Sequence, residues 1–154
     1  MAELTRQDVI KLIALSHKPL HLRGSDLSGL DLSKLHLADV DLTYTNLSET
    51  NLTDAILWRA RMFKANLSNA QLVGADLKNA DLISTNLINA DLREASLENA
   101  SFCGAALYNA NLKDARWEGA DFDGAMVNEH TVWPDDFDKD LFVLETKNGM
   151  VQSG

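Results

Sequence analysis

Three aspartates near the C-terminal end could bind a metal ion. Asp136, Asp138 and Asp140 alternate along the chain as the acidic ligands of a calcium loop do. Leu141, however, occupies the position where such a loop needs glycine for its sharp turn, and Glu145 lies two residues short of the bidentate position. We therefore interpret this segment as a solvated acidic turn.

The four histidines are the other candidate metal ligands. His17 and His21 are four residues apart, but Pro19 between them prevents the two rings from sharing a helix face. His36 and His130 have no cysteine or acidic residue at ligand spacing. The sequence therefore predicts no metal site and no cofactor.

The sequence contains one cysteine that could act as a nucleophile. Cys103 is the only cysteine, so it cannot form an internal disulfide, and no base is placed beside it. The chain lacks the G-x-S-x-G, Walker and G-x-G-x-x-G patterns. Asp121 and Asp123 form a carboxylate pair of a kind that repeat surfaces produce routinely. We predict that the protein is not an enzyme.

A five-residue period in the sequence indicates the fold that positions the side chains discussed above. An apolar residue recurs at every fifth position from Leu22 to Val127, in 22 consecutive units without a break in phase. Two residues before these central positions, 18 of the 22 units hold Ala, Ser or Thr. A period of five matches neither the 3.6 residues of a helix nor the 2 of a strand, so the chain must turn once in every unit.

The consensus Ala-(Asp/Asn)-Leu-x-x appears as ADLKN, ANLSN and ANLKD, and it resembles the pentapeptide-repeat family over about residues 20–129. The resemblance is to bacterial members, cyanobacterial ones among them. It implies an all-β fold in which four units make one square coil and the coils stack into a right-handed quadrilateral β-helix. Twenty-two units would make about five and a half coils.

The central residues are expected to fill the axis of this solenoid. The predicted core includes Leu27, Leu47, Leu67, Leu77, Leu87, Leu97, Phe102, Leu107, Trp117 and Phe122. Asp or Asn precedes the central residue in 12 of the 22 units. We expect these short polar side chains to serve turns and hydrogen bonds between coils.

The ends of the solenoid need caps, because they expose unpaired backbone groups. Residues 1–19 are predicted to form an N-terminal capping helix, in which Thr5 and Asp8 make a capping box and Val9, Ile10, Leu12 and Ile13 form an apolar stripe. Residues 20–129 form the β-helix, and its first coils are widened by Leu20, Leu30, Leu35 and Val40 where the helix packs.

Residues 130–154 are a C-terminal cap or tail with two open interpretations. Trp133, Phe137, Leu141 and Phe142 offer an apolar lid for the last coil. The resemblance implies a second arrangement, since members of the quinolone-resistance branch pair two rods end to end through C-terminal residues. The protein is therefore expected to be a monomer or an end-to-end dimer.

A coil of four units places residues twenty apart above one another, so the sequence maps the surface. Trp58 and Phe63 fall in successive units across one corner, with Arg and Lys residues beside them. Aromatic side chains fringed by arginine are typical of binding hot spots. The candidate partner-binding residues are Tyr44, Trp58, Arg59, Arg61, Phe63, Ile83, Ile88 and Tyr108. The same map places Cys103 at or near the surface.

Charge and targeting signals narrow the function further. The formal net charge of −9 argues against direct nucleic-acid binding and disfavours an acidic partner. We find neither a secretory signal pattern nor an apolar stretch long enough to cross a bilayer, so we expect a cytoplasmic protein without a membrane partner.

Two functions remain. The leading hypothesis is a non-enzymatic protein-interaction scaffold that presents a rigid surface to an unknown protein partner. The alternative is implied by the resemblance: some family members mimic duplex DNA and bind DNA gyrase, altering its activity or its quinolone sensitivity. Residues 20–129 carry 16 acidic and 9 basic residues, which are mixed on every face, so we rank DNA mimicry second.

Overall fold

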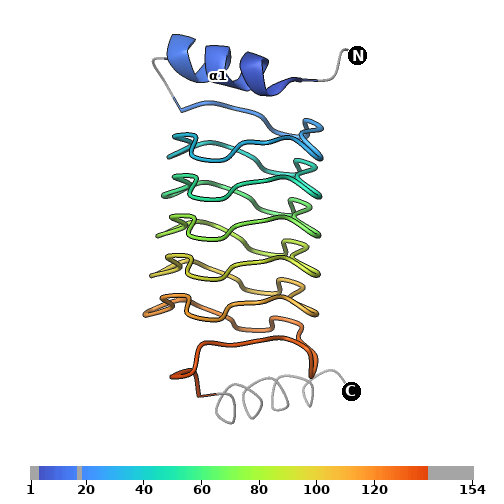
Figure 1. The fold of residues 1–154 in the computed structure, drawn as a ribbon, viewed down its shortest axis with the longest axis vertical. Coiled ribbons are helices and arrows are strands. Elements are labelled where there is room, and N and C mark those ends of the chain that lie inside the picture. Colours follow the sequence, from blue (N-terminus) through green and yellow to red (C-terminus); the bar gives the residue numbers. More distant parts are fainter. Residues whose placement is uncertain (1–3, 17–18, 139–154) are drawn as a thin grey trace.

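A computed structural model describes residues 4–16 and 19–138. One helix, α1 (Arg6–Leu15), lies across the end of a column of stacked coils (Figure 1). The β structure of the described ranges consists of isolated parallel bridges, whose partners are twenty residues apart from His21↔Asp41 to Ala106↔Met126. Since the chain turns once every five residues, each coil has four corners. The last bridge, Asn111↔Val132, spans 21 residues, so the regular register ends after residue 127.

Each corner is a tight turn with one residue in the left-handed backbone region. In the unit centred on Leu57, for example, the Ala60 N–H donates to the Leu57 carbonyl at 2.9 Å. The third residue of the turn has a positive φ in all 21 units from Gly24 to Gly124, as a type II turn requires. Glycine fills six of these positions, and Asn or Asp, which tolerate this φ, fill eight more. The remaining turns carry other residues, at a cost of roughly 1–2 kcal/mol each.

Neighbouring coils are joined by backbone hydrogen bonds and by the short polar side chains. The Leu57 N–H donates to the Asp76 carbonyl at 2.7 Å, and the Arg59 N–H donates to the Lys78 carbonyl at 2.9 Å. All twelve Asp and Asn residues before a central position accept the backbone N–H two residues further on. Some also link coils, as where Asn66 Nδ2 donates to Asn46 Oδ1 at 3.2 Å. The predicted role of these residues is confirmed.

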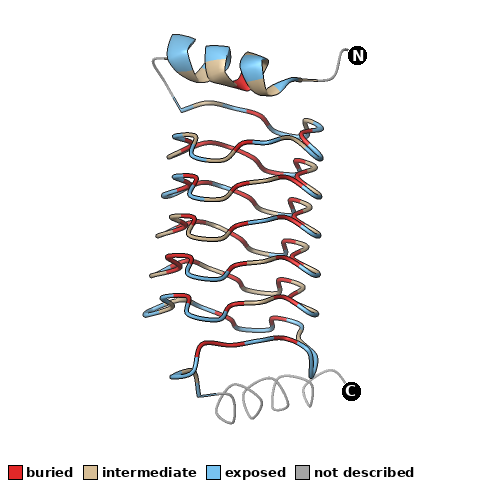
Figure 2. Ribbon diagram, viewed as in Figure 1, coloured by how far each residue is buried: buried red, intermediate tan, exposed pale blue. Residues whose placement is uncertain are grey.

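The core runs along the axis of the column, and buried segments recur in every coil (Figure 2). The alanines two residues before the centres line the same axis, as Ala55 and Ala60 do with no exposed surface. Of the ten predicted core residues, nine are buried. Trp117 is only partly buried, because it lies in the last coil and packs against the core from its end.

The N-terminal helix is fixed by its cap and by contacts with the first coils. Thr5 and Asp8 form the predicted capping box, and Val9 is fully buried. Arg6 donates to the Asp31 and Ser33 carbonyls. The stripe prediction is wrong for Leu12, which is exposed. The helix packs through Val9 and Ile13, against a core that includes Val40 and the partly buried Leu20, Leu30 and Leu35.

Aromatic rings cover the other end of the column. Trp133 and Phe137 stack with centroids 4.1 Å apart, and both rings meet Phe122 edge-on. Trp117 Nε1 donates to Asp136 Oδ1 at 3.1 Å, so one of the three alternating aspartates serves this end structurally. Leu141 and Phe142, which were also predicted for the lid, lie outside the described residues.

We expect the left-handed backbone conformation of the turn, and not steric crowding, to limit which residues are tolerated at the third turn position. Gly29 has φ +66°, and a Cβ there would meet no atom within 4 Å. Gly29→Val should therefore lower the free energy of unfolding by about 1–2 kcal/mol through backbone strain alone. Gly29→Asn should change it by less than about 0.5 kcal/mol, because asparagine tolerates this φ. Urea unfolding followed by circular dichroism measures both, and equal losses would contradict this explanation.

Candidate protein-interaction surface

The predicted aromatic patch occupies two successive corners, which corrects the expectation that it crosses one corner. Trp58 and Arg59 form one turn, which we call the Trp58 corner, and Phe63 and Lys64 form the next, the Phe63 corner. Arg61 lies between them, in the middle of the flat side that we call the first face. The sequence map misplaced the rings because it did not show that both residues after each centre belong to the turn.

At the Phe63 corner two rings meet at an edge. Tyr44 lies one coil nearer the N-terminus, and its N–H donates to the Phe63 carbonyl at 3.0 Å. The two ring centroids are 5.8 Å apart with planes at 82°, and Lys64 Nζ lies 5.3 Å from the centroid of Phe63. Tyr44 is 54% exposed, so much of this aromatic surface faces solvent. The half-buried Ile83 continues the corner on the next coil.

At the Trp58 corner an arginine covers a tryptophan. Arg59 Cζ lies 4.2 Å from the centroid of Trp58, and Arg59 Nε donates to Asp39 Oδ1 at 2.7 Å. The carboxylate of Asp39 thereby holds the guanidinium over the ring. Ile56, in the same unit, is exposed to the same extent as Trp58, at 38%. Sequence reasoning missed Ile56, although its position before a central residue marks it as outward-facing.

The first face is organised around one buried carboxylate that sequence reasoning also missed. Asp41 is only 3% exposed, and its Oδ2 lies 3.7 Å from Arg61 Nη1, 4.0 Å from Arg23 Nε and 3.6 Å from His21 Nδ1. Burial alone would raise the pKa of Asp41, but hydrogen bonding from Thr43 and the charges of Arg61 and Arg23 outweigh it and hold the pKa below its ordinary value. Reading residues 21, 41 and 61 as one column would have shown the cluster.

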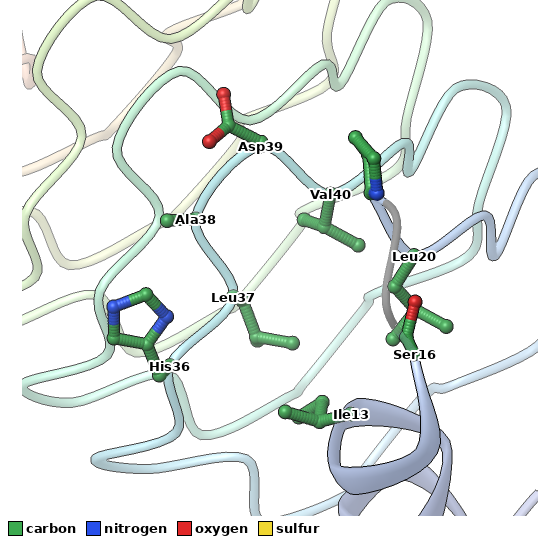
Figure 3. A pocket seen from close by; sticks show the side chains of 9 residues that line it. Ile13, Ser16, Leu20, His36, Leu37, Ala38, Asp39 and Val40 are labelled. Atoms are coloured by element: carbon green, nitrogen blue, oxygen red, sulfur yellow. The ribbon is translucent and has the colours of Figure 1, made fainter.

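A cleft of about 390 Å³ opens between the end of α1 and the first coils. Ile13, Leu20, Leu37 and Val40 surround it, while the carboxylate of Asp39 points away from it (Figure 3). Ser16 and His36 also line the cleft, so its walls are of mixed polarity. The cleft ends beside the Trp58 corner, since the Asp39 N–H donates to the Trp58 carbonyl at 2.9 Å.

The remaining two candidate residues lie elsewhere. Ile88 and Tyr108 occupy turns of the next corner round the column, in the fourth and fifth coils, and both are half-buried. An asparagine ladder follows that corner, with Asn109 Nδ2 donating to Asn89 Oδ1 at 2.9 Å. The structure thus brings Tyr44, Phe63 and Ile83 together, keeps Trp58 and Arg59 one corner away, and separates Ile88 and Tyr108 from both groups.

The chemically reactive side chains have structural partners. Cys103 is half-buried and its Sγ donates to Asp121 Oδ2 at 3.0 Å, which raises the pKa of the thiol and keeps it protonated. Within residues 4–16 and 19–138, no three His, Cys, Asp or Glu side chains are placed to hold a metal ion. His17, Asp140 and Glu145 lie outside these ranges. The described helices include none with the length and apolarity that a bilayer crossing requires.

The fold and this surface define a class of protein: a solenoid of five-residue units with an aromatic, arginine-bearing side. The profile of pentapeptide repeats matches residues 21–59, 60–99 and 100–129, and the chain belongs to this family. Solved structures of the family imply the right-handed quadrilateral β-helix that the sequence predicted. No curated protein matches the chain.

Several solved structures resemble the chain. The pentapeptide-repeat protein Rfr23 of the cyanobacterium Cyanothece 51142 is 29% identical with a TM-score of 0.72, over 73% of this chain and 90% of that one. HetL of Nostoc sp. PCC 7120, involved in heterocyst differentiation regulation, is 20% identical with a TM-score of 0.25, over 80% and 95%. The plasmid-mediated fluoroquinolone resistance protein QnrB1 is 14% identical with a TM-score of 0.34, over 71% and 83%.

We expect the charge of Asp41 to stabilise the column above pH 4. Its folded pKa is below the unfolded value near 3.9, so the contribution is complete above that value and is lost as the pH falls through the folded pKa. Asp41→Asn keeps an acceptor for Thr43 but replaces the charged Oδ2, which faces Arg61 and Arg23, with an uncharged NH2 group, so it should cost roughly 1 kcal/mol at pH 7. This loss should shrink below pH 4 in urea unfolding.

Asp26→Asn is the matched control, because Asp26 makes the same turn contact with Ser28 but is exposed on another face. It should have a smaller effect at pH 7. A loss for Asp41→Asn that stays constant from pH 7 to pH 3 would contradict the assignment.

Proposed function

We propose that this protein is a non-enzymatic protein-interaction scaffold whose docking surface is the first face with its two corners. One observation carries the proposal. Of the seven large hydrophobic residues that are exposed in the described ranges, three belong to the second coil: Tyr44 at the Phe63 corner, Trp58 at the Trp58 corner, and Ile56 beside that second corner. Exposed aromatic rings beside arginine are the composition of binding hot spots.

The scaffold suits this role because its surface is already ordered. Each coil is tied to the next by backbone hydrogen bonds at corners and faces, so the side chains stand at fixed spacings. Docking onto such a surface costs little conformational entropy. Arg59 is held between Asp39 and Trp58 before any partner arrives. We place this activity in the cytoplasm, as expected from the sequence.

The DNA-mimic alternative receives less support from the charge distribution. A mimic of duplex DNA needs rows of free negative charge. Six carboxylates instead pair with Lys or Arg: Asp31, Asp39, Asp41, Asp76, Asp91 and Glu98. Mixed charges of this kind favour the scaffold function over DNA mimicry.

Substitutions at the two corners should separate binding from folding. Phe63→Asp and Trp58→Asp place a charge where solvent already reaches, so the β-helix should persist while partner capture from an extract of the source cells falls at least tenfold. Capture is measured by quantitative pull-down, and folding by circular dichroism. Tyr108→Asp, at a different corner, is the matched control and should retain capture.

Leu77→Asp provides the unfolded reference. Leu77 has no exposed surface, so a carboxylate there should cost about 4 kcal/mol or more and unfold the column. A partner that is captured equally by the wild type and by the Phe63 and Trp58 variants would exclude the proposed surface.

The alternative function has its own test. We expect no change in DNA gyrase supercoiling, with or without a quinolone, when the protein is added up to a large excess. The physical reason is that paired carboxylates do not reproduce a phosphate row. Dose-dependent inhibition or protection would overturn the ranking and direct attention to the acidic faces and to dimerisation.

A further inference from the structure

The basic residues of the column are concentrated where the aromatic rings are. Residues 20–129 contain nine Lys and Arg residues in a chain of net charge −9. Four of the nine lie on or beside the N-terminal half of the first face: Arg23, Arg59, Arg61 and Lys64. Only two acids, Asp39 and Asp41, lie among them, so this area carries a positive surplus on an acidic protein.

The basic side chains of this area face solvent, while one of its two carboxylates is buried. Arg61 and Arg23 share the single carboxylate of Asp41, and their side chains are more than half exposed while Asp41 is buried beneath them. Lys64 is exposed and lies over the ring of Phe63; the described part of the chain provides it with no acidic partner. A molecule that approaches the first face therefore meets cations and ring edges, and not the carboxylate.

The acidity of the rest of the column does not cancel this local charge. At physiological ionic strength the Debye length is about 8 Å, so charges on the opposite sides of the column are largely screened. The net charge of the chain led us to disfavour an acidic partner in the sequence analysis. It does not describe the local charge of the first face.

The remainder of the first face limits the size of the partner. Asp81, Asp121 and Asp123 lie along its C-terminal half and on the adjoining corner. They would repel a phosphate backbone or an anionic membrane that extends along the column. The cationic area is accordingly one face wide and about three coils tall, which suits a short chain segment that crosses from the Trp58 corner to the Phe63 corner.

We propose that the docking surface recognises a short acidic protein segment that carries an aromatic or large aliphatic anchor. Its carboxylates pair with Arg61, Arg23 and Lys64, and its apolar anchor packs against Tyr44 and Phe63 at one corner or Trp58 and Ile56 at the other. This inference rests on the proposed function and specifies the chemistry of the partner.

A random peptide library displayed on phage and selected on the immobilised full-length protein provides the probe. We expect the enriched peptides to be more acidic than the starting library and to contain an aromatic or aliphatic residue. In fluorescence anisotropy, Lys64→Glu should weaken such a peptide about fivefold or more. Lys34→Glu should leave the affinity within twofold, because Lys34 occupies the same positive-φ turn position on another corner.

The choice of variants keeps the fold intact. Glutamate already occupies this turn position at Glu49 and Glu94. Arg61→Gln provides a second test, since Gln71 fills the equivalent slot of another face, and it should also weaken the peptide.

The outcomes separate this inference from the proposed function. Suppose the selected peptides are neutral or basic, and their binding is lost in the Phe63→Asp variant but kept in the Lys64→Glu variant. This result would overturn the inference of an acidic partner and leave the proposed interaction surface standing. Selected peptides that ignore Phe63→Asp and Trp58→Asp would exclude the surface itself. Binding of a 20-base-pair DNA duplex or of phosphatidylglycerol vesicles that is abolished by Lys64→Glu, without acidic peptides being selected, would assign the cations to a phosphate ligand and overturn the inference.

Discussion

The whole structure depends on the backbone hydrogen bonds of the parallel bridges that pair residues twenty apart. They hold only if every coil contains the same number of residues, and this in turn requires each unit to close its turn after five. The left-handed residue at every corner supplies that closure. Packing of the central leucines then stabilises a register that the turns have already set, so the core, the corners and the surface spacing share one origin.

Much of this architecture could be predicted from the residues. The phase from Leu22 to Val127 identified the core, and the Thr5–Asp8 spacing identified the helix cap, because both depend on local patterns. The extent of burial at Leu12 and Trp117 could not be predicted, since it depends on how the two ends pack. The positive φ at positions such as Tyr44 and Lys64 could not be predicted from the sequence either, because these residue types do not favour that conformation.

The candidate surface was predicted less completely than the fold. Its rings were identified from composition, but their distribution over two corners depends on which slots belong to the turn. Asp41 escaped notice because it looks like any of the twelve turn-forming Asp and Asn residues. Only the stacking of His21 and Arg61 on either side of it, with Arg23 at the corner, makes its environment different.

The four-cornered coil makes the position of every surface residue a matter of counting. Deleting five residues between Tyr44 and Trp58 would leave each remaining turn intact, yet it would rotate everything downstream by a quarter of a coil and carry Trp58 to another side of the column. Deleting a whole coil of twenty residues, such as residues 21–40, would keep Trp58 on its side of the column and move it one coil nearer to α1. In this fold, mutations that change length by whole units can redesign a recognition surface without substituting any of the residues that remain.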